Sequence, residues 1–280
     1  MKKKVFTLRN AAALLMLATI ATSCKKNQDE TNQLDSATSL SRKGTAAKPV
    51  YELVWSDDFT GGKLDSTKWS VVTGNQHVNN ELQAYTSDAV SVGNSGRLYI
   101  ATSKITSDGQ AYTSGKITTA GKFSFQYGRI EAMISNPNAA GLTSEFTLQG
   151  IDHPTVGMPK SGEIDIMQHR NNETQIYGGI QWDNEGYAVF RGTAVSQPSQ
   201  PQLYAVEWDT KEIRYYVSGK LYQTVSIADG VNSTEEFHKP FFINLDVTVG
   251  GNFAGDNIAP YLPINTGFYY VKVYKLKGSK

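Results

Sequence analysis

The sequence predicts an all-β fold, a two-sheet antiparallel sandwich. Short alternating runs rich in Val, Ile, Thr, Tyr and Phe recur along the chain, and Gly, Asn and Asp break them. Such runs are typical of strands joined by tight turns, and no long helical periodicity competes with them. One domain of about 230 residues fits, because all-β sandwiches commonly reach that size undivided.

Each expected strand is an alternating or β-branched run bounded by turn residues. Ser218-Gly219 lies between two such runs, where a tight hairpin turn fits. Pattern alone gives no strand order. In chain order the expected strands are Tyr51–Trp55, Leu98–Ser103, Tyr112–Thr118, Phe123–Ser135, Thr143–Leu148, Glu163–Met167, Gln175–Trp182, Gln202–Trp208, Glu212–Val217, Lys220–Ser226, Phe241–Val249 and Phe268–Tyr274.

Residues 1–24 predict a secretory signal peptide. Four basic residues precede the short apolar segment Ala11–Ile20, which is too short for a transmembrane helix that stays. Cys24 follows as the only cysteine of the chain, so it has no partner for an internal disulfide. Its position resembles a bacterial lipobox, in which the cysteine is lipidated and becomes the mature N-terminus. A plain signal peptide with an incidental cysteine is the alternative.

Residues 25–48 are polar and small, and they predict a flexible tether before a domain at 49–280. We therefore expect an exported bacterial lipoprotein of the outer membrane, on either its periplasmic or its cell-surface face. With 27 basic and 26 acidic residues the chain is nearly neutral. This balance argues against a nucleic-acid partner or a polybasic membrane patch.

The segment SGEIDIMQ at 161–168 carries the most chemical information. Glu163 and Asp165 are two residues apart in an apolar, β-favouring context, so both carboxylates should point to one face. Acids embedded among Ile and Met are costly unless they act or are well hydrogen-bonded. Retaining glycoside hydrolysis uses a carboxylate nucleophile and a protonated acid about 5–5.5 Å apart. Gln168 stands where that acid is needed.

Glu145 is a second candidate on the preceding strand. Alternation places residues 143, 145, 147 and 149 on one face, while Phe146 and Leu148 face the core. Glu145 therefore either lies in the same cleft as the motif or faces solvent from an open strand. The pattern leaves both alternatives open.

From about Tyr51 to Tyr274 the chain resembles the family 16 glycoside hydrolases, in particular laminarinase-type bacterial endo-β-1,3-glucanases. The resemblance implies a concanavalin A-like jelly roll with a substrate cleft across its concave sheet. The segments that carry it are VWSDDF at 54–59, NNELQAYT at 79–86, YTSGKITT at 112–119, GKFSFQYGRIEAMI at 121–134, SGEIDIM at 161–167, YAVEW at 204–208 and KPFFINLDVTVGGNFAG at 239–255.

The catalytic motif of this branch is Glu-x-Asp-x-x-Glu, and its extra residue, here Met167, implies a β-bulge that returns the third position to the cleft. By resemblance Glu163 is the nucleophile, Asp165 its helper and Gln168 the general acid/base. An amide cannot give a proton to a departing sugar oxygen or take one from water. General acid/base catalysis contributes about 10²–10⁴-fold, so this one substitution could nearly silence hydrolysis.

The resemblance also implies substrate contacts and shows further departures. Two tryptophans that stack on sugar rings in the family correspond to Thr143 and Thr147, which removes two sources of sugar affinity. The family's histidine is Gln181, its asparagine is Asp246 and its tryptophan is Phe253. The expected substrate-binding residues are Asn80, Arg129, Glu145, Gln181, Trp182, Asp246 and Phe253.

Two roles stay open for Arg129. It contacts a sugar hydroxyl or carboxylate, or it forms a salt bridge with Glu131 or an acid on the next strand. No cofactor is expected. Many family members hold a structural Ca²⁺, for which Asp58 is a candidate ligand, but Tyr269 replaces the second expected acid. The histidines at 153, 169 and 238 lack metal-ligand spacing.

We therefore expect a carbohydrate-active lipoprotein that engages a β-linked polysaccharide, with β-1,3-glucan or mixed-linkage glucan as the first candidate. Hydrolysis is expected to be weak or absent because of Gln168. The alternative is an active retaining endo-glycosidase with Glu163 as nucleophile and a relocated acid such as Glu145. Besides the polysaccharide, the expected partners are a membrane lipid and other glycan-uptake proteins.

Overall fold

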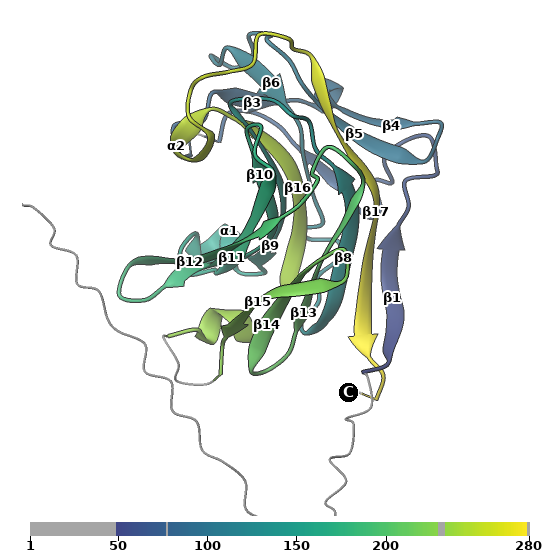
Figure 1. Ribbon diagram of the computed structural model, residues 1–280, viewed down its shortest axis with the longest axis vertical. Helices are drawn as coiled ribbons and strands as arrows, with labels where there is room; N and C mark the ends of the chain where they lie inside the picture. Colours follow the sequence, from purple (N-terminus) through teal and green to yellow (C-terminus); the bar gives the residue numbers. More distant parts are fainter. Residues whose placement is uncertain (1–48, 77, 229–232, 279–280) are drawn as a thin grey trace, which may run out of the picture. The chain divides into compact units, whose positions relative to one another are not determined.

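The computed structural model describes residues 49–76, 78–228 and 233–278. The expected signal peptide, Cys24 and the whole of the expected tether lie outside these ranges. Within them, two antiparallel sheets lie face to face (Figure 1), which confirms the predicted sandwich. The first sheet has seven strands, in the spatial order β12 (Tyr187–Val195), β11 (Gln175–Asp183), β10 (Glu163–Arg170), β9 (Leu142–Gly150), β16 (Phe241–Val249), β7 (Lys116–Thr118) and β2 (Ser70–Val72).

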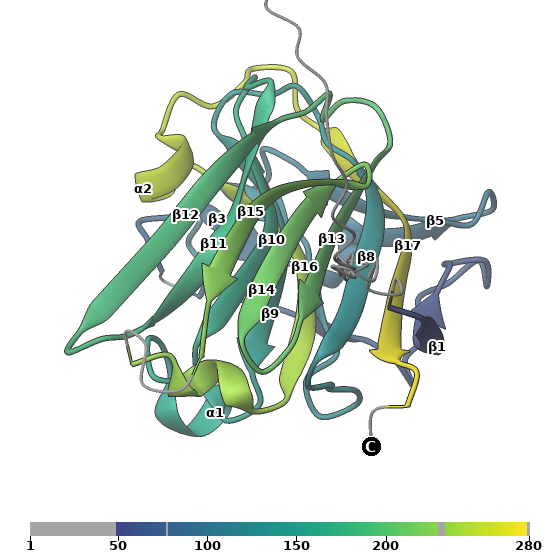
Figure 2. The same cartoon turned by 60° about the horizontal axis from the view of Figure 1, so that its bottom comes forward.

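The second sheet packs against the first. Its order is β15 (Lys220–Ser226), β14 (Glu212–Val217), β13 (Gln202–Trp208), β8 (Gly128–Ser135), β17 (Ile264–Leu276), β5 (Arg97–Thr102) and β4 (Val90–Gly93), with β1 (Tyr51–Asp57) also pairing with β17. Its strands β13, β14 and β8 are seen in the tilted view of Figure 2. A small parallel pair joins β3 (Gln83–Tyr85) to β6 (Tyr112–Ser114). The helical turns are α1 (His153–Val156), α2 (Gly251–Ala254) and the 3₁₀ turns η1 (Ser87–Ala89) and η2 (Glu235–His238).

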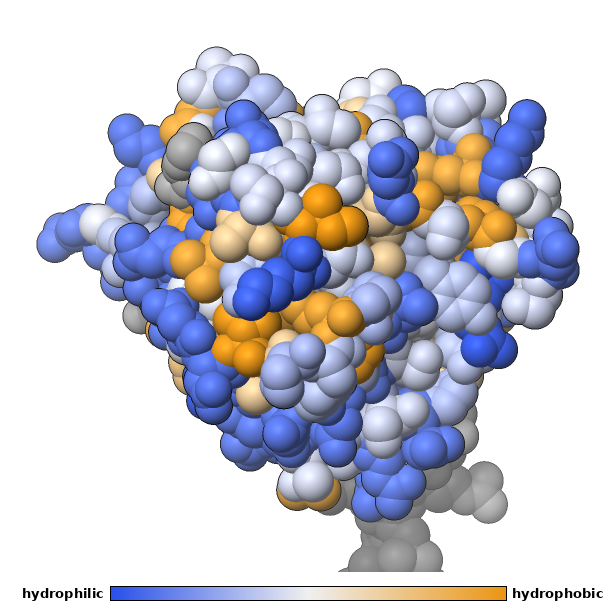
Figure 3. All heavy atoms as spheres, turned by 90° about the horizontal axis from the view of Figure 1, so that it is seen from above, coloured by the Kyte–Doolittle hydropathy of each residue, from blue (hydrophilic) through white to orange (hydrophobic). Residues whose placement is uncertain are grey.

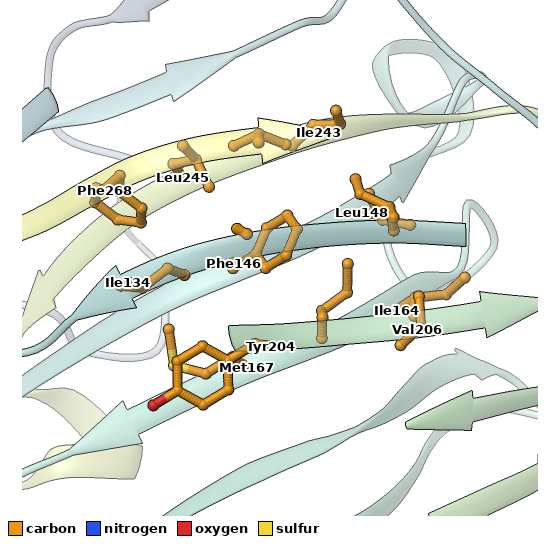
Figure 4. Packing of buried hydrophobic residues seen from close by; sticks show 14 of the residues in the cluster. Ile134, Phe146, Leu148, Ile164, Met167, Tyr204, Val206, Ile243, Leu245 and Phe268 are labelled. Atoms are coloured by element: carbon orange, nitrogen blue, oxygen red, sulfur yellow. The ribbon is translucent and has the colours of Figure 1, made fainter. Parts of the chain in front are cut away.

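The core lies between the two sheets and is built by the alternation of strand side chains. Phe146, Leu148 and Ile164 point inward from the first sheet and meet Tyr204 and Val206 of the second (Figure 4). All five side chains are buried. Burial of this apolar face fixes which face of β9 and β10 looks outward, and so it positions the polar residues that alternate with the core residues.

Several expected strands have different limits in the structure. The run Tyr112–Thr118 divides at Gly115 into β6 and β7, which belong to different sheets. A Cβ at Gly115 would lie 2.8 Å from Val90, so the chain passes too close to its neighbour there for a larger residue. The run Phe123–Ser135 is a strand only from Gly128 onward, because the chain turns at Tyr127, whose φ is 59°.

Strands β2, β3, β4 and β12 were not expected from the pattern. The expected hairpin turn is confirmed: Ser218 and Gly219 have φ values of 47° and 80° and join β14 to β15. Two positive φ values are characteristic of the tight turns that match the twist of paired strands.

The surface seen from above is mostly hydrophilic, with small apolar groups separated by polar and charged side chains (Figure 3). In the described ranges, none of the helices has both the length and the apolar character needed to cross a membrane.

Candidate active site

A cleft of about 770 Å³ lies on the outer face of the seven-stranded sheet. Its floor and walls come from β7, β9, β10, β11, β12 and β16 and from the segments next to α1 and α2. Carboxyl and amide side chains dominate the floor, and aromatic rings lie at its margins. The acids that line it are Glu81, Glu145, Glu163 and Asp246; the amides include Gln149, Gln168, Gln181 and Asn244; the aromatic residues are Tyr187, Phe242 and Phe253.

The expected β-bulge is present in β10 and places Gln168 in the cleft. Asp165 is opposite Thr147 of β9, while Met167 is opposite Phe146, so one extra residue is accommodated between them. Both Ile166 and Met167 are buried in the core. Without the extra residue, a position three after Asp165 would face the core; the bulge returns it to the outer face.

Two amides from the flanking strands hold the Glu163 carboxylate. Gln149 of β9 donates from Nε2 to Glu163 Oε2 at 3.0 Å, and Gln181 of β11 donates from Nε2 to Glu163 Oε1 at 2.9 Å. Hydrogen bonds to an ionised acceptor are stronger than those between neutral groups and fix the carboxylate in one orientation. Glu163 thus lies in the cleft in a restrained position, as a nucleophile must.

Asp165 lies fully buried beneath the cleft floor. Gln181 also donates to Asp165 Oδ2 at 2.8 Å, and Arg191 Nη2 of β12 lies 3.7 Å from the same oxygen. Tyr187 OH donates to Gln181 Oε1, which fixes the orientation of this amide. Gln181 therefore links both carboxyls of the motif, at the position where the family resemblance places a histidine.

Burial raises the pKa of both motif carboxyls. The negative charge of Asp165 raises the pKa of Glu163 further, and so does the hydrogen bond that protonated Glu163 donates to the Asp165 carboxylate. For Asp165, the hydrogen bond with Glu163 and the charge of Arg191 offset part of the increase. Ionisation of Glu163 therefore requires a higher pH than that of an exposed glutamate.

Glu145 lies in the cleft and not on a solvent-facing surface outside it. It is directly opposite Gln168 on one side and Asp246 on the other. Gln168 Nε2 donates to Glu145 Oε1 at 3.3 Å. Asp246 accepts a hydrogen bond from Tyr85 OH at 3.0 Å and lies 3.8 Å from Lys116 Nζ.

Phe253 of α2 lines the cleft, and two guanidinium groups pack close to its ring. The Arg170 and Arg191 guanidinium carbons lie 4.6 Å and 4.8 Å from its ring centroid. Tyr177 packs against the ring edge at 5.3 Å. These contacts fix an aromatic surface in the cleft, which is the kind of surface on which sugars and other planar ligand faces pack.

Three expected substrate contacts are not supported by position. Arg129 lies on the second sheet, where its guanidinium pairs with Glu131 at 2.9 Å and Glu207 at 3.2 Å. The salt-bridge alternative is therefore the observed one. Trp182 follows Gln181 on β11, so it points to the opposite face and is buried in the core. Asn80 does not line the cleft; its side chain donates to Asn252 at 2.8 Å.

Sequence reasoning gave no site role to many cleft residues, among them Glu81, Lys116, Gln149, Tyr187 and Arg191. Gln149 was placed on the correct face of its strand without a role. Tyr187 and Arg191 lie on β12, a strand that was not expected. The available signal was alternation within 187–191, where every second residue faces the cleft.

The residues present do not fit a structural Ca²⁺ at the expected place. Asp58 accepts a hydrogen bond from Thr60 Oγ1 at 2.8 Å and is exposed. Where the second acid was expected, Tyr269 lies under the Arg97 guanidinium at 3.9 Å, so a cation already occupies this surface. Among the residues that the structure describes, no group of three or more His, Cys, Asp or Glu is arranged to hold a metal ion.

Comparison with protein families assigns this cleft to a known scaffold. The model of the family described as glycosyl hydrolases family 16 matches residues 66–260. The chain belongs to glycosyl hydrolase family 16. The catalytic domain of an endo-1,3-β-glucanase (laminarinase) from Thermotoga petrophila RKU-1 is 31% identical in sequence with a TM-score of 0.76, covering 82% of this chain and 100% of that one.

Two curated relatives have different names, and one of these names gives a substrate. The clotting factor G alpha subunit of Tachypleus tridentatus is 34% identical over 233 residues, which are 81% of this chain and 34% of that protein. The keratan-sulfate endo-1,4-β-galactosidase of Sphingobacterium multivorum is 30% identical over 295 residues, 96% of this chain and 68% of that protein. The chain thus spans about a third of the first relative and two thirds of the second.

The family 16 cleft in this chain retains a restrained carboxylate that can attack an anomeric carbon. A buried neighbouring acid lies beside it, which matches the nucleophile and helper positions of the motif. The third position presents an amide, which donates and accepts hydrogen bonds but transfers no proton at ordinary pH. The cleft therefore has the parts for orienting a sugar and forming a covalent bond to it, and lacks an acid at the usual place.

Proposed function

We propose that this family 16 protein holds a β-linked polysaccharide in the cleft and hydrolyses it weakly or not at all. A β-1,3-glucan or mixed-linkage glucan is the first candidate, and the similarity to a laminarinase catalytic domain supports it. The similarity to an enzyme that acts on keratan sulfate makes that glycan a necessary comparison in any binding test.

One observation carries this proposal: Gln168 points into the cleft beside an intact Glu163–Asp165 pair. A sugar alkoxide is a poor leaving group, so its departure needs a proton from a neighbouring acid. Gln168 supplies none, while the amides, carboxyls and aromatic rings around it remain able to bind sugar hydroxyls and ring faces.

Electrophoresis in gels that contain laminarin, barley mixed-linkage glucan or keratan sulfate tests binding directly. We expect at least one polysaccharide to slow the migration of the parent protein. Phe253→Ala should weaken that binding by about 2- to 12-fold, because an aromatic contact contributes roughly 0.5–1.5 kcal/mol.

Phe190→Ala is the matched control for Phe253→Ala. Phe190 is exposed on β12 and alternates with Val189 and Arg191, which line the cleft, so it points away from it. Its replacement should leave retardation unchanged. Unretarded migration of the parent in all three gels, or equal losses from both substitutions, would count against glycan binding in this cleft.

We also propose export and lipid anchoring through Cys24, supported by the basic and apolar segments before it and by the absence of another cysteine in the sequence. Cells that are fed a radioactive fatty acid should label the parent protein, which should sediment with membranes. The Cys24→Ala variant should lose the label and appear in the soluble fraction. Equal labelling of both proteins would contradict lipidation at this residue.

A further inference from the structure

An acid on the neighbouring strand lies beside the amide that ends the catalytic motif. Glu145 of β9 and Gln168 of β10 are direct cross-strand partners, and both line the cleft. Glu145 Oε1 is 3.3 Å from Gln168 Nε2. A carboxyl group thus lies one hydrogen bond away from the position at which the motif normally presents its acid.

A second carboxyl group lies next to Glu145 on a third strand. Asp246 of β16 is the cross-strand partner of Glu145 on the side opposite Gln168. Tyr85 donates to Asp246 Oδ2 at 3.0 Å, and Lys116 lies 3.8 Å from Asp246 Oδ1. These contacts fix Asp246, which is only 2% exposed, next to Glu145. Glu145 therefore lies between a neutral amide that donates to it and a second carboxyl group.

The electrostatic environment favours a protonated Glu145. Burial, followed by the negative charge of Asp246, raises the pKa of Glu145 well above its ordinary value. A carboxyl that keeps its proton near neutral pH is what a general acid needs. The titratable groups that face Glu145 are Asp246, Glu81, Glu163, Asp165, Lys116 and Tyr85.

We propose that Glu145 is the general acid/base of this cleft and that Gln168 and Asp246 are positioning residues for it. The inference rests on the proposed function and deepens it, because it assigns the residual hydrolysis to a named group. Gln168 orients the Glu145 carboxyl through its amide, and Asp246 keeps the proton on it. A glutamate at 168 would repel an ionised Glu145, whereas glutamine holds it.

The reaction proceeds in two balanced steps. Glu163 attacks the anomeric carbon while the bond from that carbon to the leaving sugar oxygen breaks, and Glu145 gives its proton to that oxygen. Ionised Glu145 then takes a proton from water, whose oxygen attacks the anomeric carbon and releases Glu163 as a carboxylate. The sugar keeps its anomeric configuration, as two displacements at one carbon require.

Glu145→Gln tests the assignment. For the polysaccharide that retards the parent most, we expect the release of reducing ends to fall by about 10²-fold or more. With a dinitrophenyl β-glycoside of the same sugar, the first release of dinitrophenolate should change only a few-fold, because that leaving group needs no acid. Glu52→Gln, an exposed residue on β1, is the matched control and should leave both rates unchanged.

Asp246→Asn tests positioning through the pH profile. Glu145 must be protonated to act, so the rate falls as pH rises through its raised pKa. Removing the charge at 246 lowers that pKa, and the alkaline limb should therefore move to lower pH. The acid limb reflects ionisation of Glu163 and should move much less. An unchanged alkaline limb would overturn the role of Asp246, since a merely structural contact has no reason to set this limb.

Measuring both binding and hydrolysis distinguishes a wrong assignment of Glu145 from a wrong proposed function. If Glu145→Gln binds the polysaccharide and hydrolyses it at the parent rate, Glu145 is not the acid. If the parent is retarded by the polysaccharide but releases no reducing ends, the inference is overturned and the binding function stands. If no polysaccharide retards the parent and none is cleaved, both are overturned.

Discussion

Gln168→Glu is expected to raise the weak hydrolysis of an unactivated polysaccharide by up to about 10²-fold, because an acid at the motif position would replace Glu145 as the proton donor. The bulge in β10 already directs the side chain at 168 into the cleft, on the same strand as Glu163. A glutamate there would present an acid in the place where the family motif has one. Release of reducing ends from the bound polysaccharide measures the gain, beside the parent in the same assay.

Glu145 affects how much hydrolysis Gln168→Glu gains, so the control variants must include a change at Glu145. An acid at 168 would lie within hydrogen-bonding reach of Glu145, and two ionised carboxyls at that distance repel each other. The pair Gln168→Glu with Glu145→Ala should thus match or exceed the single variant. Gln149→Glu adds an acid beside Glu163 instead and should not raise the rate. If no variant gains activity, the departures at Thr143, Thr147 and Gln181 have changed the cleft beyond rescue by an acid.

Glu163→Gln is expected to remove turnover even of an activated substrate. Release of dinitrophenolate from a dinitrophenyl β-glycoside should fall on the order of 10³-fold or more, because loss of the nucleophile closes the two-step route. Retardation by polysaccharide should persist, since glutamine keeps the shape of the side chain. Equal turnover by parent and variant would show that Glu163 does not attack the sugar.

The same substitution should alter the dependence of stability on pH. The pKa of Glu163 is raised in the folded protein, so the folded state binds this proton more tightly than the unfolded state. The resulting stabilisation is present below the unfolded pKa and is lost as pH rises through the folded pKa. Between pH 5 and pH 8 the melting temperature of the parent should therefore fall more than that of Glu163→Gln. A larger fall in the variant would contradict the raised pKa.

The fold and the motif geometry followed from local pattern. Alternation along 143–149 correctly placed Phe146 in the core and residue 145 on the opposite face. The bulge at Met167 was expected from the resemblance to the family motif, and it is present. These features depend on neighbours in the chain, and sequence therefore carries them directly.

Features that depend on distant partners were not predictable in the same way. Arg129 alternates with core residues of β8 whichever sheet β8 joins, and its partner Glu207 is 78 residues away. The wrong prediction that Trp182 contacts the substrate could have been avoided. Neighbouring residues of a strand point to opposite faces, so Gln181 and Trp182 cannot both face the cleft. β12 was missed because it is an edge strand with large apolar side chains exposed on both faces, so its pattern lacks a buried stripe.

The side-by-side placement of Glu145 and Gln168 on adjacent strands bears on how such chains diverge. An acid at position 145 and an acid at position 168 would enter the same cleft, because the two positions are cross-strand partners. Inventories of family members that judge competence from the linear motif alone would classify such a chain as inert. Inspecting the cross-strand partner of the last motif position would identify members whose proton donor lies on the neighbouring strand.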